Sequence, residues 1–179
     1  GHCLHMYDVR NALALRPLGQ YCTTNSIGNV AVSGSFVYFV EGHEGENDQW
    51  RNMLGIIDAS APTNPVHRGA VEISGYDMSL SVESNRVFVL SSAETSDGLR
   101  ALDVFDVSNA EFPTLSSRHL LQGAATEVVV SNGKILLVGG TNGLEIFRLD
   151  DTNALVSIGR CLTREEALLR TGLLGLVDR

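Results

Sequence analysis

The residues best suited to chemistry gather in one polar stretch, residues 41–52, which reads Glu-Gly-His-Glu-Gly-Glu-Asn-Asp-Gln-Trp-Arg-Asn. It contains four carboxylates, a histidine and the only tryptophan of the chain. The candidate binding residues are therefore His43, Glu44, Glu46, Asp48 and Trp50. Carboxylate oxygens suit Ca²⁺, and an indole ring offers a flat surface for stacking. The spacing does not match an EF-hand loop, and the simpler interpretation is a solvated insertion between two strands.

Cysteines and aspartates are the other groups to consider. The three cysteines lack a metal-binding spacing. Cys22 and Cys161 fall near the ends of equivalent segments with side chains on opposite faces, so we expect free thiols. Asp8, Asp58 and Asp106 occupy equivalent positions before a turn, where we expect each to accept backbone N–H groups. The scattered histidines do not suggest a metal site.

The elements that position these residues recur along the chain. Each copy has an apolar triplet, a turn of small or polar residues and a second apolar run, which is the pattern of a tight β-hairpin. The three copies are residues 30–40, 80–90 and 128–138. We expect Gly34, Asn85 and Gly133 to supply the positive φ angles of the turns.

Two further strands follow each hairpin. The third strands are residues 54–58, 102–106 and 144–148, with a matching segment at 4–8. The fourth strands lie around residues 18–21, 67–70, 115–118 and 157–160. Four strands per unit, at a spacing of roughly 40–50 residues, are typical of a β-propeller blade. The sequence therefore predicts an all-β fold, a β-propeller of three full four-stranded blades preceded by an N-terminal half blade.

Several of these segments resemble the LVIVD repeat, a short propeller-type repeat common in bacterial and archaeal proteins and often found in exported ones. The resemblance rests on residues 4–12, 30–40, 55–62 and 103–110 and extends over the chain to about Thr163. The last copy departs from it, because Arg148 stands in place of the aspartate. The resemblance implies no catalytic residue, and it implies an extracellular or cell-surface location if the gene also encodes a signal peptide, which this stretch does not show.

The repeats define the domain organisation. Residues 1–163 are expected to form the repeat domain, and residues 164–179 a C-terminal helical and apolar tail. Residues 163–166, Thr-Arg-Glu-Glu, read as a capping box, so we expect a short helix over residues 164–170. Both ends of the propeller are incomplete, which suggests either a homo-oligomer that closes the ring or a fragment of a longer gene.

Composition limits the partners. The formal net charge is −8, which disfavours nucleic acid, since phosphate binding depends on lysine and arginine. No apolar run is long enough to span a membrane. We expect no cofactor, with Ca²⁺ as the one open possibility at the polar insertion.

Two functions remain open, beside the possibility that the chain is a structural fragment with no independent activity. The first is a non-enzymatic β-propeller repeat module that binds a protein or a glycan through the loops between second and third strands. The alternative is a metal-dependent, lactonase-like propeller hydrolase with a site in the central channel. Its ligands would be Asn29, Asp77 and Glu127, which lie at or near the starts of the innermost strands.

Overall fold

The computed structural model describes residues 2–11, 13–44, 50–93, 99–123, 125–139 and 143–161, apart from the side chains of Glu44 and Asp77. Every regular element within these residues is a β-strand. The strands are β1 (His2–Asp8), β2 (Arg16–Thr23), β3 (Ser26–Ser33), β4 (Phe36–Glu44), β5 (Trp50–Asp58), β6 (Val66–Ile73), β7 (Tyr76–Glu83), β8 (Arg86–Ser92), β9 (Arg100–Asp106), β10 (Thr114–Leu121), β11 (Glu127–Ser131), β12 (Lys134–Val138), β13 (Leu144–Leu149) and β14 (Leu155–Cys161).

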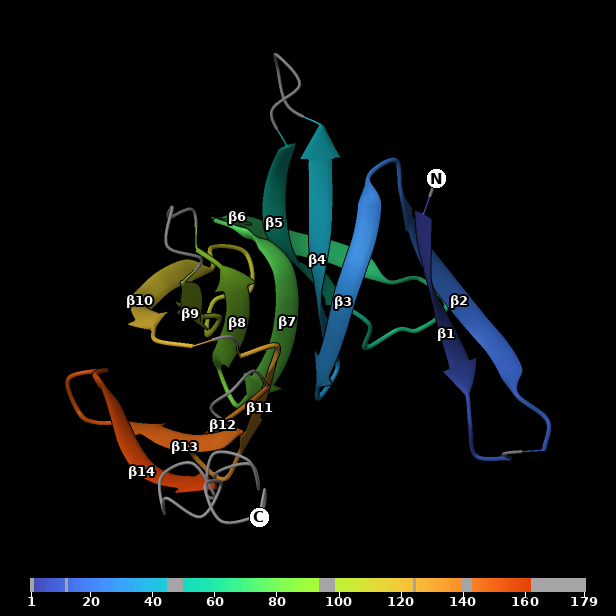
Figure 1. Ribbon diagram of the computed structural model, residues 1–179. Coiled ribbons are helices and arrows are strands. Elements are labelled where there is room, and N and C mark those ends of the chain that lie inside the picture. Colours follow the sequence, from blue (N-terminus) through green and yellow to red (C-terminus); the bar gives the residue numbers. More distant parts are fainter. Residues whose placement is uncertain are drawn as a thin grey trace, which may run out of the picture.

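These strands form four antiparallel sheets that follow the order of the chain. The first sheet is two-stranded, β1–β2, and three four-stranded sheets follow, β3–β6, β7–β10 and β11–β14. Within each sheet, consecutive strands are hydrogen-bonded neighbours. The sheets succeed one another around an arc that runs from β1–β2 to β11–β14 (Figure 1). The all-β prediction is confirmed, and each sequence repeat coincides with one sheet.

Short turns join the first two strands of each four-stranded sheet. Gly34 and Gly133 have φ angles of 59° and 69°, as expected. In the second hairpin the positive angle belongs to Ser84, at 54°, and the expectation for Asn85 is wrong. Glu83 pairs with Arg86, so Ser84 is the first residue of a two-residue loop. It occupies the same loop position as Gly34, where the chain must reverse with φ above zero.

Neighbouring sheets pack face to face through three apolar clusters. One joins β1–β2 to β3–β6, the second joins β3–β6 to β7–β10, and the third joins β7–β10 to β11–β14. The middle sheets are covered on both faces, which explains why their central strands β4, β5, β8 and β9 are nearly continuous apolar runs. Alternate residues of one strand serve opposite clusters: Tyr38 belongs to the second cluster, and Phe39 to the cluster with β1–β2.

The first strands of the four-stranded sheets also touch one another, with β7 between β3 and β11. Ser79 Oγ and Ser81 Oγ of β7 accept hydrogen bonds from the backbone N–H groups of Val128 and Val130, at 3.1 and 2.9 Å. The β11 edge that faces β7 has no strand partner in the described sheets. The serine hydroxyls therefore satisfy backbone donors that the sheet itself leaves unpaired.

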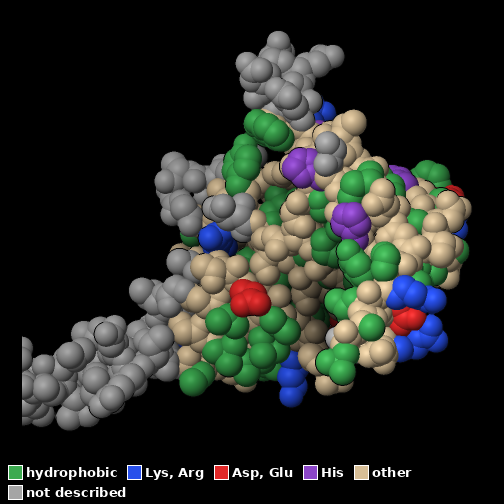
Figure 2. All heavy atoms as spheres, turned by 90° about the vertical axis from the view of Figure 1, so that its right-hand side faces the viewer, with side chains coloured by type: hydrophobic (Ala, Val, Ile, Leu, Met, Phe, Trp, Pro, Cys, Tyr) green, Lys and Arg blue, Asp and Glu red, His purple; other side chains and the backbone are tan. Residues whose placement is uncertain are grey.

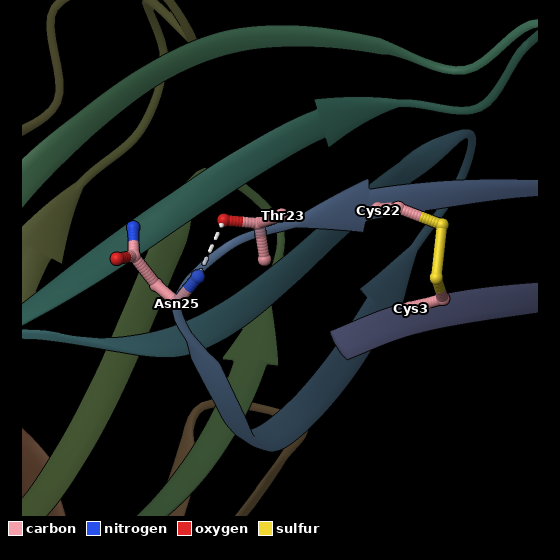
Figure 3. Close-up of a disulfide and its surroundings, with 4 residues drawn as sticks. All are labelled: Cys3, Cys22, Thr23 and Asn25. Carbon is pink, nitrogen blue, oxygen red and sulfur yellow. Dashed lines mark hydrogen bonds between the residues drawn. A yellow bond between two sulfur atoms is a disulfide. The ribbon is translucent and has the colours of Figure 1, made fainter. Parts of the chain in front are cut away.

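A disulfide links the two strands of the first sheet. Cys3 and Cys22 are directly opposite in the β1–β2 register, and their sulfur atoms are bonded (Figure 3). The expectation of free thiols is therefore wrong for this pair. It compared Cys22 with the distant Cys161, which is exposed, and overlooked the hairpin register that places Cys3 across the ladder from Cys22. Cross-strand neighbours in an antiparallel pair are close enough for such a bond.

The expected helix over residues 164–170 and the tail of residues 164–179 lie outside the described residues. Within the described part of the chain, no helix has the length and apolarity needed to cross a membrane.

Candidate functional site

A buried carboxylate, Glu41, lies at the end of β4 beside the link from β2 to β3. Its relative exposure is only 5%. Glu41 occupies the first position of the polar stretch, where β4 extends past the apolar core into the loop region. The strand pairs on both sides here, with Ile27 of β3 and Met53 of β5, so the Glu41 backbone is fixed from two directions.

Three polar side chains surround this carboxylate. Thr23 Oγ1 donates a hydrogen bond to Glu41 Oε1, and Asn25 Nδ2 donates to the same oxygen at 3.1 Å. His43 Nε2 is 3.1 Å from Glu41 Oε2, and His43 Nδ1 is 3.2 Å from Asn25 Nδ2. With Nε2 as donor and Nδ1 as acceptor, one histidine tautomer satisfies both contacts. Thr23, Asn25, Glu41 and His43 form a closed hydrogen-bonded group, called here the Glu41 cluster.

The Glu41 cluster connects the disulfide hairpin to the next sheet. Thr23 follows Cys22 directly, and its hydroxyl also accepts a hydrogen bond from the Asn25 backbone N–H at 3.2 Å (Figure 3). The cluster therefore fixes the direction in which the chain leaves β2 and enters β3. It also orients the imidazole of His43, whose side chain is 40% exposed, at the molecular surface.

Opposing effects act on the pKa of Glu41. Burial raises it, while the hydrogen bonds from Thr23, Asn25 and His43 lower it, and the net pKa is below the usual value of 4.5. A carboxylate with a lowered pKa in the folded state stabilises the fold above its unfolded-state pKa and loses that contribution as pH falls through the folded-state value. Glu41 is thus expected to add to acid sensitivity below about pH 4.5.

Glu41→Gln is expected to reduce the fall in melting temperature between neutral pH and about pH 3, because the substituted amide does not titrate. It is also expected to lower stability at neutral pH by about 1–3 kcal/mol, since charge-assisted hydrogen bonds are lost. Thermal unfolding followed by circular dichroism over this pH range measures both effects. Glu72→Gln, at an exposed carboxylate of β6, is the matched control. An unchanged pH dependence in Glu41→Gln would contradict the assignment.

Two exposed aromatic side chains lie at the same end of the sheets. Trp50 is 56% exposed and Tyr76 is 53% exposed. Trp50 begins β5 and its ring lies against Gly42, since a Cβ placed there would be 3.6 Å from the indole Cζ3. Asn52 Nδ2 donates to the carbonyl of Gly75 at 2.8 Å, which joins β5 to the residue before Tyr76. We define the loop face as Asn25, His43, Trp50, Asn52 and Tyr76.

A comparison with protein families supports the repeat organisation. Residues 26–72 match the LVIVD repeat. The matched segment contains the whole β3–β6 sheet apart from the last residue of β6, and it contains Glu41, His43 and Trp50. The resemblance noted from the sequence is thereby confirmed over these residues. No curated protein matches the chain in a sequence search.

The polar insertion of this LVIVD repeat is only partly described. His43 and Trp50 are placed as above, whereas Glu46, Asp48 and the side chain of Glu44 lie outside the described residues. Among the described residues, no group of three or more His, Cys, Asp or Glu side chains is placed to hold a metal ion. A Ca²⁺ site at the insertion stays a prediction.

The expected channel residues are not brought together by any contact in the described structure. Asn29, in the LVIVD repeat, donates its side-chain amide to the carbonyl of Met78 on β7. Glu127 is exposed at the start of β11, and the side chain of Asp77 lies outside the described residues. The Asn29 amide thus links two neighbouring sheets, which is a structural use of one proposed ligand.

The aspartates that precede the turns behave as expected. Asp58 accepts the Ser60 N–H at 2.9 Å and Asp106 accepts the Ser108 N–H at 2.8 Å. Asp8 accepts the Arg10 N–H at 3.0 Å. The guanidinium of Arg68, together with Ser60, holds the pKa of Asp58 at about 2.

Sequence reasoning missed the Glu41 cluster itself. Thr23 ends β2 and Asn25 lies in the short link to β3, which carries no recognisable motif. The sequence marks Glu41 only as one of the carboxylates of the insertion. One signal was available: Glu41 directly follows a buried apolar run, where a carboxylate requires hydrogen-bond partners.

Proposed function

We propose that the sheets are blades of a β-propeller and that the chain is a non-enzymatic repeat module that binds a protein partner through the loop face. The observation that carries this proposal is the exposure of Trp50 and Tyr76 at the end of the sheets where the loops and links converge. Tryptophan and tyrosine are enriched at the centres of protein interfaces, where they bury a large area.

The surroundings of Trp50 support a recognition role. A Cβ placed on Gly42 would be 3.6 Å from the indole Cζ3, so the ring lies close to the β4 backbone. With only two χ angles, a tryptophan side chain loses little conformational entropy on binding. His43 pairs with Arg51 whereas Trp50 pairs with Glu44, so the two side chains lie on opposite faces of the β4–β5 hairpin. The Glu41 cluster orients His43 there, and His43 adds a polar group to the loop face. Tryptophan is among the residue types enriched at the hot spots of protein interfaces.

The disulfide bears on where this module works. Stable structural disulfides persist in oxidising environments such as the cell exterior and the bacterial periplasm. The Cys3–Cys22 bond therefore supports an extracellular or cell-surface location, which we include in the proposal.

The experiment that tests the function compares binding by the unmodified chain with binding by Trp50→Ala. We expect a protein partner to be retained on the immobilised chain and its affinity to fall about tenfold or more in Trp50→Ala, as for a central interface tryptophan. Phe112→Ala is the matched control, because Phe112 is 72% exposed but lies in the turn before β10, at the other end of the sheet. A glycan array probed with the same three proteins tests the other ligand class.

Retention of a protein by all three forms alike would overturn the proposal, as would binding to a glycan that depends on Trp50.

We also propose that association of chains completes the ring of blades, since the β1–β2 sheet has only two of the four strands of a blade.

A further inference from the structure

Neighbouring sheets pack through the same repeat positions at successive junctions. On the side that faces the preceding sheet, β5 presents Ile57 and β9 presents Phe105, with relative exposures of 0% and 1%. Ile57 packs in the cluster shared with β1–β2, and Phe105 packs in the cluster shared with β3–β6. Val107, just after β9, is buried at 5% in the same cluster as Phe105. We call the face of a sheet that carries these positions, which is the face toward the preceding sheet, the back of that sheet.

A turn and a glycine form the second part of the first two junctions. At Gly69 of β6, an added Cβ would lie 2.6 Å from the carbonyl oxygen of Ala110 and 2.7 Å from that of Glu111, in the turn of the following sheet. At Gly19 of β2, the equivalent position, a Cβ would collide with the Pro62 carbonyl oxygen. At these two junctions the last strand of one sheet carries a glycine, and the next sheet's turn lies directly on its backbone. The equivalent position of β10 is Ser117, which pairs with Val104.

The back of the β1–β2 sheet has no neighbouring sheet in the described structure. Tyr7 is the counterpart of Ile57 and Phe105, and Val9 is the counterpart of Val107, yet they are 48% and 66% exposed. The turn that follows carries Leu13, which is 98% exposed. Figure 2 views this side of the molecule and shows hydrophobic side chains spread over it. The positions of Tyr7 and Val9 are thus uncovered in the first repeat, whereas Phe105 and Val107 are buried at the same positions of a later one.

The opposite end of the array lacks the matching neighbour. On β11–β14, Gly159 is the counterpart of Gly19 and Gly69. Gly159 pairs with Ile146 across the ladder, just as Gly19 pairs with Met6 and Gly69 pairs with Ile56. A Cβ added at Gly159 would meet only the side chain of Ile146, at 3.7 Å, so no turn lies on this glycine in the described structure. Val138 of β12, on the same face as Ile146, is 39% exposed.

We propose that these two surfaces bind each other between two copies of this chain. The back of β1–β2 in one copy packs on the outer face of β11–β14 in the next, with the turn around Leu13 on Gly159. The inference rests on the proposed blade arrangement, and it reuses a junction that the chain already forms within itself. A second copy is the occupant that the structure favours, because each chain supplies both halves of the contact.

Such a contact is head-to-tail, since different surfaces of the two copies meet. It differs from strand addition at the open edge of β1, which would use backbone hydrogen bonds and leave Tyr7 and Val9 uncovered. It also lies apart from the loop face, so substitutions in one surface leave the other intact.

The test uses two single variants of the full chain and their mixture. Val9→Asp places a charge on the back of β1–β2. Gly159→Val adds a side chain on the outer face of β14, at the position where the turn around Leu13 of the other copy would lie. Sedimentation velocity should show that the unmodified chain self-associates and that each variant alone is at least about tenfold weaker. An equimolar mixture should recover a heterodimer, because the Gly159→Val chain keeps an intact back and the Val9→Asp chain keeps an intact outer face.

Phe112→Asp is the control for an added charge at an exposed apolar side chain, and it should associate like the unmodified chain. Circular dichroism verifies that every variant is folded. A monomeric unmodified chain would overturn the proposal, and so would a mixture that does not recover the heterodimer. Because Trp50→Ala is expected to associate normally, loss of partner binding reports on the loop face, and loss of association reports separately on this contact.

Discussion

Replacing Gly69 by valine is expected to lower the free energy of unfolding by about 3 kcal/mol, the upper range for overpacking of a tight contact. The new Cβ would lie within 2.6–2.7 Å of the Ala110 and Glu111 carbonyl oxygens. These are backbone atoms in a turn that Asp106 holds through the Ser108 N–H, so they have little room to move. The β3–β6 and β7–β10 sheets must separate locally to accommodate the side chain.

Gly159→Val is the matched control for this prediction. It changes the same residue type at the equivalent strand position, but its Cβ meets only the Ile146 side chain at ordinary contact distance. We expect its effect to stay within about 0.5 kcal/mol, as for most surface substitutions. Urea unfolding at a protein concentration low enough to keep the chains separate measures both variants. Equal losses of stability would show that the turn at Ala110 and Glu111 does not rest on Gly69.

Arg118→Met is expected to cost about 3 kcal/mol, because it leaves a buried carboxylate without its partner. Asp103 of β9 is fully buried, with a relative exposure of 0%. Arg118 on the neighbouring strand β10 donates from Nε to Asp103 Oδ1 at 2.7 Å and from Nη2 to Oδ2 at 2.6 Å. A two-point arginine–carboxylate contact of this kind is among the stronger polar interactions in a protein.

The double variant Asp103→Leu/Arg118→Met separates the ion pair from simple loss of packing. When both charges are replaced by apolar groups, stability is expected to return close to that of the unmodified chain. Urea unfolding of the two single variants and the double variant gives the coupling free energy directly. A loss of less than about 1 kcal/mol for Arg118→Met, in the range of a surface ion pair, would contradict the argument.

The repeat pattern was readable from the sequence because each strand has a strong local signature. The apolar runs of β4, β8 and β12 follow turns of two small or polar residues, which predict hairpins without any knowledge of the rest of the chain. The aspartates at 58 and 106 were predicted to cap turns, and their contacts with Ser60 and Ser108 span only two residues. Interactions of such short range depend on the local sequence alone.

The polar site was harder to foresee. The sequence drew attention to His43 and Trp50 through residue type. Two of the partners of Glu41, however, lie 18 and 16 residues earlier, at the end of β2 and in the link to β3. Asn29 shows the opposite case, a residue that the sequence suggests as a ligand and that instead makes a structural contact. Its position before an innermost strand suggested a ligand, and the structure shows its amide bonded to the carbonyl of Met78, far along the chain.

By itself, the sequence determined the strands, their hairpin register and their grouping into repeats, since all of these follow from alternation and turn chemistry between near neighbours. Only the tertiary structure decided how the sheets face one another. The Glu41 cluster and the contact of Gly69 with the next turn each require segments from different sheets to be brought together. The physical reason is that packing between sheets depends on which residues of one sheet lie opposite which residues of the next. That pairing involves segments far apart in the chain, so no single segment determines it.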